Sequence, residues 1–129
     1  MADDGQLRIF DLQSVPLDNI LFHSNCEFIT RLAPQGFPLH LAVHEVKHID
    51  EQPPPYVELH SHDTHEVNIL VSNNGDLIYL YCYDGQEITV KAPACIWIPA
   101  GVAHAAYAIS GSGTFVCMVL SEGYSAHQG

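Results

Sequence analysis

Positive charge is scarce in this sequence. Lysine and arginine together number 4 among 129 residues, against 15 aspartates and glutamates, and the formal net charge is −11. A protein that binds nucleic acid neutralises phosphates with clustered lysine and arginine side chains. The composition therefore excludes a general nucleic-acid-binding role, and the excess of negative charge favours the attraction of cations toward a cleft.

Long apolar runs are also missing. The longest candidate, ACIWIPAGVAHAAYAI, is interrupted by Pro99, Gly101 and His104, and it falls short of the ~18 residues that a membrane-spanning helix needs. The N-terminus, MADDGQL, carries acidic residues where a secretory signal would be basic. We therefore expect a cytoplasmic protein with no membrane partner.

Paired cysteine motifs do not occur. The four cysteines are widely spaced and form no C-x-x-C pair: Cys26, Cys82, Cys95 and Cys117. We expect reduced thiols that pack as small apolar side chains. With 129 residues, 47% of them hydrophobic, the chain is long enough to bury a core of its own without disulfide bonds.

Short β-prone runs dominate the chain after Cys26. Runs such as LHLAVHEVKHI, EVNILVS and DLIYLYCY alternate with turn signals such as PQGFP, SNNGD and YDGQ. No segment of useful length has helical periodicity. Strands separated by turns at this spacing predict an all-β sandwich or barrel over residues 26–121, with an N-terminal arm at 1–25 and a C-terminal tail at 122–129.

The stretch ELHSHDTHE concentrates side chains that can bind a metal ion. Alternate residues of a strand share one face. A strand over residues 56–62 would therefore place His60 and His62 on one face, together with Glu58. Two imidazoles at this spacing can converge on a single ion.

Two further groups extend this pair of histidines. Glu66 is an even number of residues from His60 and His62, so in an extended chain it would share their face. The segment PAGVAH supplies His104 at the start of a later strand. Three imidazoles and a carboxylate form a mixed nitrogen and oxygen set that suits Fe(II), Mn, Ni, Co or Zn.

The two segments, in this order, resemble the motif pair of the cupin superfamily. HSHDTHE has the form H-x-H-x3-E, and PAGVAH has the form P-x-G-x2-H. The resemblance covers about residues 38–121 and implies a small single-domain cupin with a double-stranded β-helix (jelly-roll) barrel. It also implies one divalent transition metal per chain, with Fe(II) favoured, held by His60, His62, Glu66 and His104.

Some positions depart from the cupin pattern. The glycine that usually closes the first motif comes later here, as Gly75, while Pro93 and Ala108 stand where the second motif usually has glycine and asparagine. These positions shape turns and the barrel end, so the departures concern the geometry of the site more than metal binding. If His65 were a ligand instead of Glu66, the site would resemble that of the four-histidine polyketide cyclases.

Several neighbouring side chains are candidates for acid–base or substrate-binding roles. Glu58 shares the histidine face, His44 points inward if that face of HLAVHEVKH lines the barrel, and Tyr81 is one of three tyrosines on one face of its run. The structural alternatives are a rim carboxylate, a packed histidine, and tyrosine packing or an oligomer surface. The predicted substrate pocket is formed by Asn68, Ala106 and Ala108.

An open metal position inside an apolar barrel permits two kinds of chemistry on a small organic molecule. Fe(II) can bind O2 and substrate together, whereas a Zn, Ni or Mn ion can polarise a carbonyl as a Lewis acid. The ligand set resembles that of cupin dioxygenases, so we expect a dioxygenase-type oxidoreductase. The alternatives are an isomerase, a lyase or a polyketide-cyclase-like enzyme.

A non-catalytic small-molecule sensor is a further alternative, because the barrel segment also resembles the ligand domain of AraC-type regulators. Small cupins commonly pair through sheet edges or exchanged arms. The resemblance therefore implies a homodimer, in which we expect the arm at residues 1–25 to cross between chains.

Overall fold

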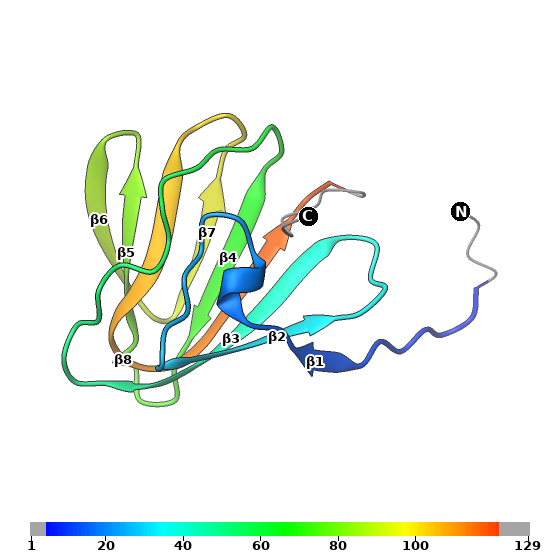
Figure 1. Cartoon of the computed structure of the whole chain (residues 1–129), viewed down its shortest axis with the longest axis horizontal. Helices are drawn as coiled ribbons and strands as arrows, with labels where there is room; N and C mark the ends of the chain where they lie inside the picture. Colours follow the sequence, from blue (N-terminus) through cyan, green and yellow to red (C-terminus); the bar gives the residue numbers. More distant parts are fainter. Residues whose placement is uncertain (1–4, 122–129) are drawn as a thin grey trace.

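Apart from one short 3-10 helix, the regular secondary structure consists of β-strands, as Figure 1 shows for the computed structural model, which describes residues 5–121. The predicted all-β architecture is confirmed. The predicted C-terminal tail at 122–129 lies outside the described residues. The elements are β1 (Leu12–Ser14), the short 3-10 helix η1 (Leu17–Asn19), β2 (Ile29–Pro34), β3 (His40–Ile49), β4 (Glu66–Val71), β5 (Ile78–Tyr83), β6 (Gln86–Lys91), β7 (Ala94–Ile98) and β8 (His104–Val119).

The long strand β8 joins two antiparallel sheets (Figure 1). Its first half pairs with β5, which in turn pairs with β6, and its second half lies between β3 and β4. β2 and β1 extend the second sheet beyond β3, and β7 extends it beyond β4. Gly111 sits where β8 passes from one sheet to the other, with a φ of 82°. A Cβ at this position would collide with the backbone carbonyl of Asp76, so only glycine fits there.

The main core lies between the two sheets and includes the tyrosine face of β5. Tyr79 and Tyr81 are 1% and 4% exposed, and the Tyr79 ring stacks on Phe115 at a centroid distance of 4.6 Å. The two tyrosines thus fill the barrel and do not form an oligomer surface. Leu70, Leu77 and Ile98 complete the most buried part of this core.

The predicted strand over residues 56–62 does not form. This segment makes only isolated bridges, one between His23 and Val57 and one between His60 and His104. Tyr56 and Val57 are adjacent and both buried, so the segment does not alternate as a regular strand would. The face shared by Glu58 and the histidines is therefore lost, and the Glu58 side chain is exposed.

Many residues of the predicted arm at 1–25 instead pair with the second sheet or pack in the core. β1 pairs with β2, and Leu17 and Ile20 are buried at 3% and 4% exposure. Residues 5–9 extend away from the sheets (Figure 1), and the Leu7 and Ile9 side chains are 86% and 82% exposed.

Residues 5–121 contain no helix with the length and apolarity that crossing a bilayer would require.

Candidate metal centre

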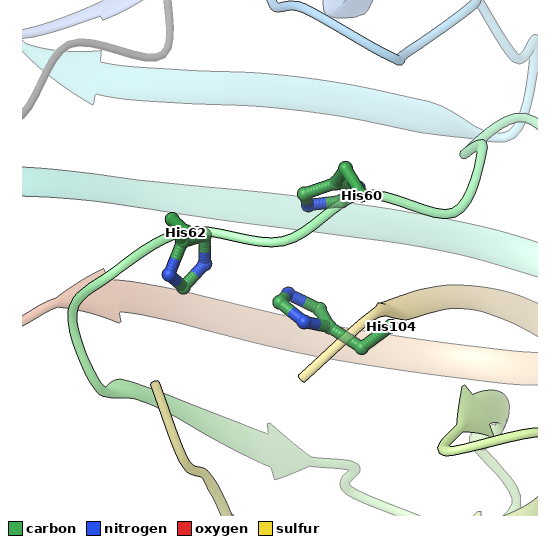
Figure 2. Close-up of side chains that lie close together, drawn as sticks. All are labelled: His60, His62 and His104. Carbon is green, nitrogen blue, oxygen red and sulfur yellow. The ribbon is translucent and has the colours of Figure 1, made fainter. Parts of the chain in front are cut away.

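Three histidines from two distant segments meet at one point. One ring nitrogen each from His60, His62 and His104 lies within 4.8 Å of the corresponding atoms of the other two. Figure 2 shows the three rings gathered around a common space, with His60 and His62 on an irregular connecting segment and His104 at the start of β8. The convergence expected of the two sequence motifs is present.

Backbone hydrogen bonds hold the two segments together. The amide of His60 donates to the His104 carbonyl at 3.0 Å, and the amide of His104 donates to the His60 carbonyl at 2.8 Å. A third bond, from the Gly101 amide to the His62 carbonyl at 2.8 Å, anchors the other end. The separation between the histidines is thus set by the main chain.

Each of the three rings is oriented by its Nδ1 atom. Because a carbonyl oxygen can only accept, His60 donates its Nδ1–H to the Glu58 carbonyl at 2.8 Å. In the same way, His62 donates to the Thr64 carbonyl at 2.7 Å, and His104 donates to the Val102 carbonyl at 2.9 Å. This places the second nitrogen of each ring, Nε2, in the role of metal ligand, an arrangement typical of metal-bound histidines.

The surroundings of the His104 Nε2 atom indicate whether a metal ion fits the site. This atom is buried and has no hydrogen-bond partner, and buried polar atoms are rarely left without one. A divalent ion among the three rings would satisfy it. The donor set, neutral imidazoles and one carboxylate, is that of transition-metal sites.

Glu66 supplies the carboxylate from the first residue of β4. Its Oε1 atom lies 2.9 Å from His62 Nε2 and 3.4 Å from His104 Nε2. Two ligand atoms bonded about 2.1 Å from one ion lie about 3.0–3.4 Å apart, so these distances suit a shared ion. Oε2 accepts hydrogen bonds from Asn68 at 2.8 Å and from the Cys117 thiol at 3.2 Å.

The electrostatics of the site favour an ionised Glu66. Burial alone raises the pKa of this carboxyl, but its contacts with His104, His62 and Asn68 outweigh burial and hold the pKa well below its usual range. The contact between His62 and Glu66 also raises the pKa of His62, chiefly through the hydrogen bond to Glu66. Burial lowers the pKa of His60, against the opposing effect of the Glu58 carbonyl.

A cavity of about 80 Å³ adjoins the three histidines. Ala106 and His44, both candidates from the sequence, line it. His44 is 6% exposed, and burial lowers its pKa to about 3, which keeps the imidazole neutral at physiological pH.

The other predicted pocket and acid–base residues do not reach this cavity. Glu58 lies on the outside of the irregular segment, and its contact with His60 is made through its backbone carbonyl. Tyr81 donates a hydrogen bond to Asn68 at 2.9 Å, and Asn68 binds Glu66, so both residues lie behind the carboxylate. Ala108 is fully buried in the core, where its amide donates to the Tyr56 hydroxyl.

His65 is directed away from the three histidines. Its Nδ1 atom accepts a hydrogen bond from the Ala100 amide at 3.0 Å, and its ring lies 4.9 Å from that of Trp97. The side chain is exposed, and His65 is not part of the three-histidine group. The geometry favours Glu66 over His65 as the fourth ligand.

Arg31 and His23 are polar residues of the cavity wall that the sequence reasoning missed. Arg31 is 4% exposed and lines the cavity from β2, and His23 lines it from a loop. Arg31 shares its strand face with Ile29 and Ala33, so an arginine on an otherwise apolar face was the available signal. His23 lies in an irregular segment and had no periodic signal.

Solved cupin structures share this fold. The chain is similar to an RmlC-like cupin from Shewanella frigidimarina NCIMB 400 (15% identity, 81% of this chain and 86% of that one, TM-score 0.53). It is also similar to a predicted oxalate decarboxylase from Thermotoga maritima (13% identity, 85% and 91%, TM-score 0.56) and to FeII HppE (15% identity, 92% and 62%, TM-score 0.60). The expected jelly-roll cupin fold is confirmed. No protein-family model and no curated protein sequence matches the chain.

Removal of one ligand should empty the site. We expect wild-type protein to hold near one equivalent of Zn(II) and His60→Ala and His104→Ala to bind it at least about tenfold more weakly, because each substitution removes a direct ligand. Elemental analysis after equilibrium dialysis measures the bound metal. His65→Ala is the matched control and should retain the ion, whereas equal loss in all three variants would contradict this site.

The histidine–carboxylate contact should be visible in a titration of the metal-free protein. The contact with Glu66 raises the pKa of His62 above its ordinary value of 6.5. Glu66→Gln should therefore lower it, so that His62 loses its proton at a lower pH than in the wild type. NMR of the imidazole resonances follows this change. Glu58→Gln, which leaves the backbone contact to His60 in place, should not move the His62 titration; an unchanged titration in Glu66→Gln would show that the two side chains do not interact.

Proposed function

We propose that this chain is a metal-dependent cupin enzyme that acts on a small organic molecule as a dioxygenase-type oxidoreductase. The observation that carries the proposal is the common orientation of the three histidines. Each Nδ1 atom is hydrogen-bonded to a backbone carbonyl, and the buried Nε2 atom of His104 makes no hydrogen bond, although Glu66 Oε1 lies 3.4 Å away. Such a set is suited to hold one ion at the edge of a cavity.

Fe(II) is the ion we propose, with Zn, Ni, Mn or Co as alternatives. The ligands would be His60, His62, His104 and Glu66. When bound, Fe(II) would supply the capacity to activate O2. The similar structure of FeII HppE, whose name contains the ion, supports this choice.

The protein side chains have separate roles in this proposal. Asn68 and Cys117 hold Glu66 as a carboxylate by donating to its Oε2 atom, and Tyr81 orients Asn68. His44 stays neutral, so it can donate or accept a hydrogen bond in the cavity but does not serve as a proton store near neutral pH. Ala106 leaves space beside the histidines.

Lewis-acid chemistry is the second candidate function. The similar structure described as a predicted oxalate decarboxylase supports it, because that name denotes a decarboxylation. The same residues would hold the ion, and a polarised carbonyl would replace O2 as the reacting group. A sensor would bind its ligand in the same cavity without turnover.

We further propose that two chains form a homodimer through the segment before β1. Leu7 and Ile9 in this segment are largely exposed. The outer face of β4 and β7 is also apolar, with Ile69, Val71 and Trp97 at 40%, 49% and 55% exposure. Apolar patches of this kind favour association between chains.

Oxygen uptake distinguishes the candidate functions. Protein loaded with Fe(II) should consume O2 only in the presence of a substrate from a panel of small acids, catechols and thiols, and both atoms of 18O2 should enter the product. His104→Ala should abolish uptake, and His65→Ala should not. Substrate conversion without O2 by the zinc or manganese form would indicate Lewis-acid chemistry, and ligand binding without conversion by any form would indicate a sensor.

The mass in solution tests the dimer. Wild-type protein should have twice the mass of one chain in light scattering, and deletion of residues 1–11 should convert it to the monomer, because the deletion removes Leu7 and Ile9 but leaves β1 intact. The double substitution of Leu7 and Ile9 by serine should have the same effect. An unchanged mass in both variants would show that this segment does not hold two chains together.

A further inference from the structure

A positively charged side chain forms part of the cavity that adjoins the three histidines. Arg31 on β2 lies opposite His44 on β3 in the register of the two strands. Both side chains are buried, at 4% and 6% exposure, and both line the cavity. The wall formed by these two residues belongs to strands other than those that carry His104 and Glu66.

Both side chains of this wall have unused hydrogen-bonding groups. Arg31 Nη1 and His44 Nδ1 are buried without a hydrogen-bond partner. Within residues 5–121, no carboxylate lies in ion-pair distance of Arg31. Arginine keeps its charge at neutral pH, and an unpaired buried charge is costly unless a ligand of opposite charge compensates it.

The residues that line the cavity show what a ligand would meet. His23 lines it as well, and its ring centroid lies 6.0 Å from that of His60. Because Arg31, His44 and the three histidines all line one cavity, a ligand in it has both the guanidinium group and the three-histidine group around it.

We propose that the cavity binds a small carboxylic acid whose carboxylate pairs with Arg31 and whose other polar end faces the three histidines. This inference rests on the proposed function, because it names the substrate class of the same site. A guanidinium group donates two parallel hydrogen bonds to a carboxylate, and His44 offers a further polar contact beside it. Arg31 is in this view a substrate-binding residue that determines specificity.

The size and charge of the cavity favour a monocarboxylate. Its volume is about 80 Å³, and one water needs about 10–15 Å³ on the same measure, so only a few heavy atoms fit. The other three cationic side chains, Arg8, Lys47 and Lys91, are exposed. A phosphate dianion would exceed the single charge of Arg31 and would lie in the same cavity as the ionised Glu66.

Binding of defined probes tests this inference. We would titrate the zinc-loaded protein with glycolate, with its neutral analogue glycolamide and with inorganic phosphate, using calorimetry and the 15N resonances of the arginine side chains. Arg8 and Arg31 are the two arginines of the chain, so a variant of either one assigns both signals. Glycolate should bind at least about tenfold more tightly than either other probe and should shift the Arg31 signal, because only glycolate offers a carboxylate of matching charge.

Variants locate the effect. Arg31→Gln and Arg31→Met should weaken glycolate binding by about tenfold or more while zinc content and circular dichroism stay unchanged. Arg8→Gln is the matched control and should bind glycolate as the wild type does. If the Arg31 variants fail to fold, the shift of the Arg31 resonance in wild-type protein decides. Unchanged affinity in the folded variants, an unshifted resonance, or tighter binding of phosphate or glycolamide would overturn the inference.

Failure of the proposed function gives a different result. If wild-type protein binds no metal, the metal centre is wrong, and the same titration with acetate on metal-free protein still reports whether Arg31 binds a carboxylate. If zinc binds and glycolate does not, the metal centre stands and the substrate class proposed here is wrong.

Discussion

The backbone pairing of His60 with His104 is the contact on which the candidate centre depends. Its two hydrogen bonds, 3.0 and 2.8 Å long, are isolated, because the residues around His60 continue no strand ladder. A small apolar cluster holds the irregular segment in place: Leu17, Tyr56, Val57, Ala105 and Tyr107 pack together, and Val57 also lines the cavity. The geometry of the ligands thus depends on packing beside the cavity, including a residue of the N-terminal region.

β8 connects this pairing to the rest of the cavity. The strand begins at His104. After its bend at Gly111, it supplies Phe115, Cys117 and Val119 to the lining of the cavity. Glu66 enters from β4, and Arg31 and His44 enter from β2 and β3, all in the sheet that the second half of β8 completes. The positive group, Arg31 on β2, and the negative group, Glu66 on β4, are therefore carried by strands that β3 and β8 separate, and the two side chains form no ion pair.

The parts of the structure that sequence could predict are those set by side-chain type and local pattern. Imidazoles and a carboxylate at two motif spacings identified the residues that converge, and runs of β-branched residues between turns identified the all-β fold. The expectation that Glu58 shares a strand face with His60 and His62 was wrong. Adjacent Tyr56 and Val57 are both buried, so the segment is not a regular strand. Sequence patterns missed Arg31 and misjudged Tyr81 and Ala108. The surroundings of these three residues come from residues distant in sequence, which no local pattern encodes.

The outer support of the three rings comes from main-chain carbonyl groups, at residues 58, 64 and 102. Every amino acid provides such a carbonyl, so the side chains at these positions are free to change during evolution as long as the path of the chain is kept. Support of this kind leaves no trace in an alignment. The orientation of the three rings therefore depends on the path of the chain and not on the identity of these three residues.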